Sequence, residues 1–150
     1  MMWEGNWAWG VPLIVLTSEV HVLGLRLVWR VVGRGLVWGP ARWQTARLVA
    51  AMSLALLLTT ALHALEAAVW ALTYLLVGAL PDARTAMLYS VSALTTYGHA
   101  STLLPEHWRM LGALEALNGM ILFGLTTAFL FAMIQDLWPT GGRRAPGSVE

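Results

Sequence analysis

The sequence contains no cysteine and no lysine, and only 11% of its 150 residues are charged. The absence of cysteine excludes disulfide bridges, thiolate metal sites and cysteine nucleophiles. So few charged side chains cannot cover the surface of a soluble domain, in which about a quarter of the residues are charged. A net charge of +1 offers no basic patch for nucleic acid, and a hydrophobic fraction of 58% excludes a disordered chain.

Three long apolar stretches dominate the sequence, at residues 8–32, 48–80 and 110–137. Each exceeds the roughly 20 residues that a helix needs to cross a bilayer. The first is the weakest candidate, because it contains Glu19, His21 and Arg26. The second contains His63 and Glu66. The pattern predicts an all-α membrane protein with three transmembrane helices.

A different kind of segment separates the second and third stretches. Pro81 and Asp82 are typical of a helix start, and residues 83–94 are apolar enough to be buried. A helix over residues 82–95 would be only about 20 Å long, too short to cross a membrane. A polar turn follows it at residues 95–98. This order predicts a re-entrant loop, which persists at membrane depth only inside protein or beside a water-filled cavity.

Arginines set the predicted orientation. Four lie at or between the inner ends of the first two spans and two follow the third, namely Arg30, Arg34, Arg42, Arg47, Arg143 and Arg144. The positive-inside rule makes these segments cytoplasmic. We therefore expect the N-terminus and the re-entrant loop outside and the C-terminus in the cytoplasm.

Residues 87–101 read Met-Leu-Tyr-Ser-Val-Ser-Ala-Leu-Thr-Thr-Tyr-Gly-His-Ala-Ser. This stretch resembles the pore loop of potassium channels, whose members carry a pore helix followed by Thr-Thr-Val-Gly-Tyr-Gly-Asp. Residues 119–130 resemble the inner helix of that family. The block Leu-Glu-Ala-Leu-Asn-Gly at residues 114–119 resembles small bacterial members with one extra span before the pore module. The resemblance implies a re-entrant pore helix and filter loop, a homotetramer and a bacterial inner-membrane location.

By the same resemblance, the selectivity filter comprises Thr95, Thr96, Tyr97, Gly98, His99, Ala100 and Ser101. Potassium selectivity of this type needs consecutive rings of backbone carbonyls. Ala100 stands where the family has its second glycine, and His99 replaces the aromatic residue that anchors the outer filter. Tyr97 replaces a compact valine. We therefore expect a cation pore with weak or no preference for potassium.

The third helix is the expected pore lining. Its pore-facing residues would be Met120, Phe123, Thr127, Phe131 and Gln135, and the alternative for this spacing is ordinary helix packing. Gly119 takes the hinge position of the family; it and Gly124 either permit bending or allow close contact between helices. The predicted units are residues 1–47 (first helix and arginine-rich loop), 48–138 (pore module) and 139–150 (disordered cytoplasmic tail).

His63 and Glu66 lie three residues apart on one face of the second span, where an ionisable group needs a partner or a function. We expect a buried polar network of His63, Glu66, Glu115 and Asn118. In it, Glu66 accepts hydrogen bonds from the short helix or from hydroxyl groups, and Glu115 pairs with Asn118 or with the backbone.

Two other uses of these residues remain open. One is a metal site that recruits His21, Glu19 and Glu115, since imidazole and carboxylate together suit zinc or iron. The other is a haem held by His21 and His63.

No nucleophile–base arrangement is visible, so we expect no enzyme, no resident metal or cofactor and no nucleic-acid partner. The expected partners are further copies of the chain, the lipid bilayer and monovalent cations in the pore. The alternatives are a non-conducting relative of the channels, and a membrane metal- or haem-binding protein that uses His21, His63, Glu66 and Glu115.

Overall fold

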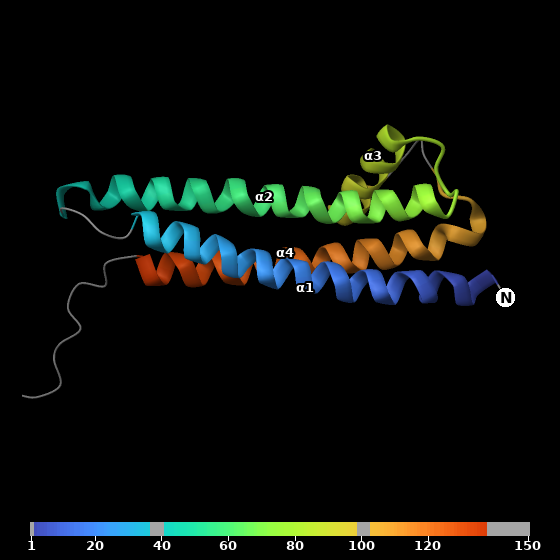
Figure 1. Ribbon diagram of the computed structural model, residues 1–150, viewed down its shortest axis with the longest axis horizontal. Coiled ribbons are helices and arrows are strands. Elements are labelled where there is room, and N and C mark those ends of the chain that lie inside the picture. Colours follow the sequence, from blue (N-terminus) through green and yellow to red (C-terminus); the bar gives the residue numbers. More distant parts are fainter. Residues whose placement is uncertain (1, 37–40, 99–102, 138–150) are drawn as a thin grey trace, which may run out of the picture.

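The computed structural model describes residues 2–36, 41–98 and 103–137, and every regular element within them is a helix. The three long helices are α1 (Met2–Leu36), α2 (Gln44–Leu76) and α4 (Arg109–Leu137). They lie side by side, with α2 antiparallel to the other two (Figure 1). The short helix α3 (Ala83–Leu94) packs against α2 and α4 near the end that holds the N-terminus. Single 3₁₀ turns at Ala41–Trp43 and Glu106–Trp108 precede α2 and α4.

Three segments of the described chain are long and apolar enough to cross a membrane, namely Glu4–Gly33, Gln44–Leu76 and Glu106–Leu137. The prediction of an all-helical protein with three such helices is therefore confirmed. The expected disordered tail, residues 139–150, lies outside the described residues.

The end of the second span was predicted wrongly, because α2 ends at Leu76 and not at residue 80. Gly78 adopts a positive φ of 67°. The backbone N–H groups of Gly78 and Ala79 donate to the carbonyls of Leu75 and Tyr74, at 3.1 and 2.8 Å. This is a Schellman motif, which satisfies carbonyls that the helix itself leaves unpaired. The glycine was the sequence signal for the true end.

The predicted start of the short helix is confirmed. The carboxylate of Asp82 accepts hydrogen bonds from the backbone N–H and the hydroxyl of Thr85, at 2.9 and 2.7 Å. These bonds hold the pKa of Asp82 below its usual range, the backbone bond contributing most. The cap is therefore complete at neutral pH and weakens as the pH falls through that lowered pKa.

Helices α1 and α4 run parallel in one register. The side chain of Asn6 donates to the carbonyl of His107 and accepts from the backbone N–H of Leu111, at 2.7 and 2.9 Å. It thereby caps the first turn of α4, whose N–H groups have no partner within the helix. Further along, Asn118 donates to the hydroxyl of Thr17 at 2.7 Å. The residues in these pairs are all 101 to 105 positions apart in the sequence. Helices α1 and α4 therefore keep the same alignment along the bundle.

The interior consists of apolar clusters near the two ends and a polar layer between them. Trp70, Tyr74 and Leu111 are fully buried at the end that holds α3. Val32 and Met133 belong to the cluster at the other end. The buried polar side chains between them include Thr17, His21, Glu66, Asn118 and Thr126. The polar layer gathers the buried side chains that can bind a ligand or an ion.

Gly119 lets the end of α3 reach α4. A Cβ atom added at Gly119 would collide with the backbone of Leu94, the last residue of α3. Gly119 follows Arg109 by ten residues, so this contact lies about 15 Å along α4. A Cβ atom at Gly124, by contrast, would have no atom within 4 Å. Of the two roles foreseen for these glycines, close contact is the one that the surroundings of Gly119 favour.

We predict that Gly119→Ala lowers the free energy of unfolding by about 1–3 kcal/mol, because the methyl group must displace α3. Gly124→Ala is the matched control. Its methyl group meets no neighbouring atom, so the higher helix propensity of alanine should raise the free energy of unfolding by up to about 1 kcal/mol. Thermal unfolding in detergent, followed by tryptophan fluorescence, compares the two. Equal melting temperatures for both variants would contradict the packing role of Gly119.

Candidate functional site

Helix α3 ends in a strained turn. Thr96 adopts a φ of 56°, and it is the one non-glycine residue with positive φ in the described part of the chain. The N–H groups of Thr96 and Tyr97 donate to the carbonyls of Ala93 and Ser92, both at 3.0 Å. This is a second Schellman motif, with a β-branched residue where glycine is usual. The left-handed conformation costs such a residue about 1–2 kcal/mol.

The predicted filter begins at this turn. Thr95, Thr96, Tyr97 and Gly98 are all exposed on the single chain, and Tyr97 reaches 87% exposure. Gly98 has a φ of 75°, a conformation that glycine adopts without strain. The remaining filter residues of the prediction, His99, Ala100 and Ser101, lie outside the described residues.

The predicted pore-lining residues share one property: their side chains are exposed on the single chain. They are Met120, Phe123, Thr127, Phe131 and Gln135. The hydroxyl of Thr127 donates to the carbonyl of Phe123 at 2.8 Å, so it is satisfied within its own helix. This face of α4 is free to meet lipid, water or another protein surface.

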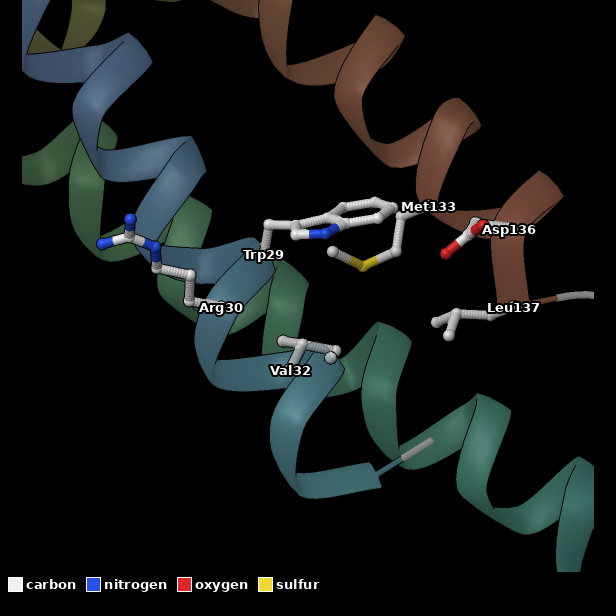
Figure 2. Close-up of a pocket in the computed structure, with 7 residues that line it drawn as sticks. Trp29, Arg30, Val32, Met133, Asp136 and Leu137 are labelled. Carbon is white, nitrogen blue, oxygen red and sulfur yellow. The ribbon is translucent and has the colours of Figure 1, made fainter. Parts of the chain in front are cut away.

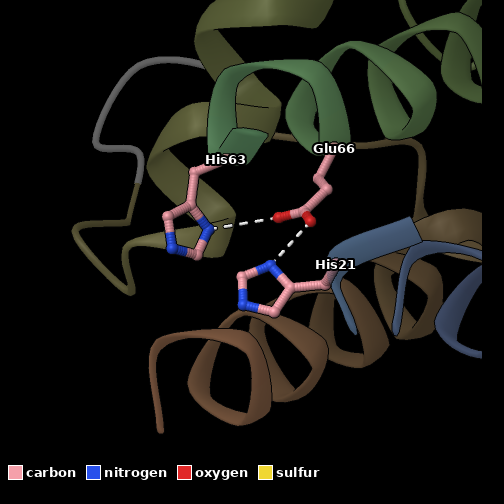
Figure 3. A group of neighbouring side chains, drawn as sticks. All are labelled: His21, His63 and Glu66. Carbon is pink, nitrogen blue, oxygen red and sulfur yellow. Dashed lines mark hydrogen bonds and ion pairs between the residues drawn. The ribbon is translucent and has the colours of Figure 1, made fainter. Parts of the chain in front are cut away.

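The polar layer contains a four-residue cluster drawn from the three long helices. Nδ1 of His21, on α1, lies 2.8 Å from Oε1 of Glu66 on α2. Nδ1 of His63, also on α2, lies 3.1 Å from Oε2 of the same carboxylate. Both rings turn these nitrogens toward Glu66 (Figure 3). Nε2 of each ring lies 3.1 Å from the hydroxyl of Thr126, on α4.

The cluster is closed to water on most sides. His21 and Glu66 are fully buried, and the side chain of His63 is 16% exposed. The ring of His63 stacks on Phe123, with centroids 4.3 Å apart and planes inclined by 19°. Oε2 of Glu66 is buried and receives no hydrogen bond from any described residue, because Nδ1 of His63 is close but poorly directed.

The structure divides the predicted polar network. His63 and Glu66 belong to the cluster with His21 and Thr126. Glu115 instead accepts a hydrogen bond from Tyr74 at 2.7 Å. The tyrosine ring meets that of Tyr89 on α3 edge to face, with centroids 5.2 Å apart.

Three of the expected pairings differ in the structure. The amide of Asn118 bonds to Thr17 and not to Glu115. Glu66 takes histidine partners in place of the expected short helix or hydroxyl groups. Glu19 is exposed and is not among the residues that could share a metal with the histidines.

Thr126 and Tyr74 were missed from the sequence. Residues 115, 118, 122 and 126 recur at spacings of three and four, which is one face of a helix. Extending the buried face from Glu115 and Asn118 would have placed Thr126 inward and its neighbour Thr127 outward. No such spacing pattern marks Tyr74, because its hydrogen-bond partner Glu115 lies on another helix, 41 residues away in the sequence.

The geometry argues against a haem between His21 and His63. Their ring centroids are 5.1 Å apart with planes inclined by 39°, and both Nδ1 atoms face one carboxylate. Two axial ligands of a haem must instead face each other across the porphyrin. The arrangement suits a proton or a small ion.

A hollow of about 360 Å³ opens between α1 and α4 at the end remote from α3 (Figure 2). Its walls are mainly apolar, and Arg30 and Asp136 stand at its rim with their charged groups well apart. It lies among Trp29, Val32 and Met133 and has no group in common with the polar cluster. No chemistry is apparent in it.

We predict that Thr96→Gly raises the free energy of unfolding by about 1 kcal/mol, because glycine relieves the left-handed strain. Thr95→Gly is the matched control. Thr95 has a φ of −83°, so glycine there adds only flexibility and should lower stability by about 0.5–1 kcal/mol. Thermal unfolding of both variants beside the parent protein measures the effect. A lower melting temperature for Thr96→Gly would show that the threonine side chain contributes more than its strain costs.

No protein-family model matches the chain. No curated protein and no solved structure matches it either. The resemblance to pore-loop potassium channels thus rests on the sequence motifs alone.

Proposed function

We propose that the chain is the protomer of a tetrameric, pore-loop cation channel-like protein whose non-standard filter, Thr-Tyr-Gly-His-Ala, discriminates weakly between potassium and sodium. The observation that carries this proposal is the position of the exposed turn after α3. Leu94 rests against Gly119, about 15 Å along α4, and the exposed residues Thr95 to Gly98 follow it directly.

Backbone of this kind has few tolerable surroundings in a membrane. Lipid cannot satisfy exposed N–H and carbonyl groups, so non-helical backbone at depth must be enclosed by protein or border a water-filled cavity. A single chain leaves the turn exposed. Further copies around a common axis would enclose it and would supply rings of carbonyl groups to a passing cation.

The exposed face of α4 agrees with this arrangement. Met120, Phe123 and Phe131 are apolar and exposed, and Thr127 and Gln135 add polar groups on the same side. The hydroxyl of Thr127 is satisfied within its helix and tolerates either surrounding, but the amide of Gln135 would be costly against lipid and is accepted by a water-filled cavity. Phe131, twelve residues beyond Gly119, would then form an apolar constriction on the cytoplasmic side, and such constrictions can gate by dewetting.

The oligomer and its selectivity can be tested together. Mass photometry in detergent should show four chains, and liposomes should pass potassium and sodium at similar rates but not chloride. The combined variant Tyr97→Val, His99→Tyr, Ala100→Gly and Ser101→Asp should raise the preference for potassium, because it restores the family filter. A tetramer that passes no ion would overturn the channel and leave a non-conducting scaffold. A chain that stays monomeric or dimeric would overturn the assembly as well.

The predicted constriction has its own test. Phe131→Ala should increase ion flux several-fold, because a wider and wetter opening lowers the barrier. Phe129→Ala is the control, since Phe129 is half-buried and meets Trp29 edge to face within the bundle. We expect it to lower stability and leave flux unchanged. Equal flux in Phe131→Ala and the parent protein, with the parent clearly conducting, would make Phe131 a packing residue.

A further inference from the structure

We propose that His21, His63 and Glu66 bind one divalent transition metal ion of the zinc class inside the helix bundle. The site does not require the proposed tetramer, because its donor atoms lie within a single chain. One ring nitrogen from each histidine and one carboxylate oxygen of Glu66 lie within 4.8 Å of one another. Figure 3 shows both rings turned toward the carboxylate.

The donor spacing is close to that of a loaded site. Zinc binds nitrogen and oxygen donors at about 2.0–2.2 Å, so tetrahedral donors stand about 3.4 Å apart. Nδ1 of His21 lies 2.8 Å from Oε1 of Glu66, and Nδ1 of His63 lies 3.1 Å from Oε2, so each nitrogen already faces one oxygen of the carboxylate. Three protein donors also leave one position open for water, and His63 provides the partly exposed side of the cluster.

The side chains around the donors are arranged as metal ligands require. A histidine that binds metal through one ring nitrogen usually donates its other N–H to an oxygen, and this bond fixes the orientation of the ring. Nε2 of His21 and Nε2 of His63 both lie 3.1 Å from Oγ1 of Thr126. The hydroxyl oxygen has two lone pairs and can accept both N–H groups. One threonine therefore orients both ligands.

The rival occupant is a proton. Without metal, both rings would direct an Nδ1–H group toward Glu66. The hydroxyl of Thr126 could then donate a hydrogen bond to Nε2 of one ring. It could accept one from Nε2 of the other ring only if that ring carried a second proton. This arrangement is electrically neutral. However, the contact between Nδ1 of His63 and Oε2 of Glu66 is poorly directed for a hydrogen bond, which is costly for a buried carboxylate. A cation among the three donors would contact that oxygen directly.

The chemistry of the donors sets the class of ion. Two imidazoles and one carboxylate suit zinc, iron, cobalt or nickel, whereas magnesium and calcium prefer oxygen donors alone. His63 and Glu66 come from one turn of α2, and His21 comes from α1. A bound ion would therefore join the first helix to the second.

The test uses the tag-free full-length protein in detergent, stripped with a chelator and titrated with zinc and, as a spectroscopic probe, with cobalt. We expect one zinc per chain, a higher melting temperature with zinc, and cobalt absorption bands in the visible range. Magnesium in excess should not displace the cobalt. A stripped protein that binds neither ion stoichiometrically would overturn the site and leave the proton as occupant.

Substitutions locate the site. His21→Ala and Glu66→Gln should weaken zinc binding by more than about 100-fold, and Thr126→Val by about 10- to 100-fold because it removes only the orienting hydroxyl. Thr126→Val nearly keeps the side-chain shape, so it serves if the other two variants fail to fold. Glu115→Gln and Thr127→Val are the matched controls and should leave zinc affinity unchanged. Zinc affinity that is unaltered in Thr126→Val and Glu66→Gln would place the ion elsewhere and refute the proposal.

Discussion

The carboxylate of Glu66 is fully buried in the second half of α2, where it cannot reach bulk water. An ionisable group in such a place must be paired, because leaving it alone costs several kcal/mol. Its partners fix the neighbouring helices: His21 brings α1 against α2, and Thr126 brings α4 against both rings. Apolar side chains can slide past one another at small cost, but these directed contacts hold in a single register. The helix arrangement thus depends on one carboxylate.

A second level of the bundle holds α3. Here Tyr74 joins Glu115 on α4 by a hydrogen bond and meets Tyr89 on α3 with its ring. Close approach of the α3 end to α4 depends on the missing side chain at Gly119. The layer of the bundle that contains the proposed metal site and the layer that holds α3 and its exposed turn are therefore built by different residues. They share helices α2 and α4, through which one could influence the other.

The sequence was sufficient for the parts of the fold that depend on local pattern. Length and apolar content predicted the three long helices, and Pro81 with Asp82 predicted the start of the short one. The end of α2 was predicted wrongly because Gly78 lies inside an apolar run that continues past the helix end, so hydropathy alone does not mark it. The pairing of buried groups could not be predicted from spacing alone. His63 and Glu66 are neighbours on one helix, but their partners His21 and Thr126 are set by the packing of three helices.

The same limit explains the outcome for Glu115. On the sequence it was expected to pair with Asn118 or with the backbone, and a metal site shared with the histidines was the alternative. Which inward faces meet depends on the register between helices, and that register follows from contacts such as Asn6 with the start of α4. Residue spacing reports the period of a helix but not its rotation or its height relative to a neighbour.

The long sequence distance between α1 and α4 has a consequence for biosynthesis. The first helix leaves the ribosome about 100 residues before its partner, at roughly 5–20 residues per second. During that interval Asn6, Thr17 and His21 have none of the α4 contacts that they make in the finished bundle. A newly made α1 is thus a poorly satisfied apolar helix that depends on α4 for its final position. Synthesis of α4, and not that of α1, is the step that commits the bundle to its native arrangement.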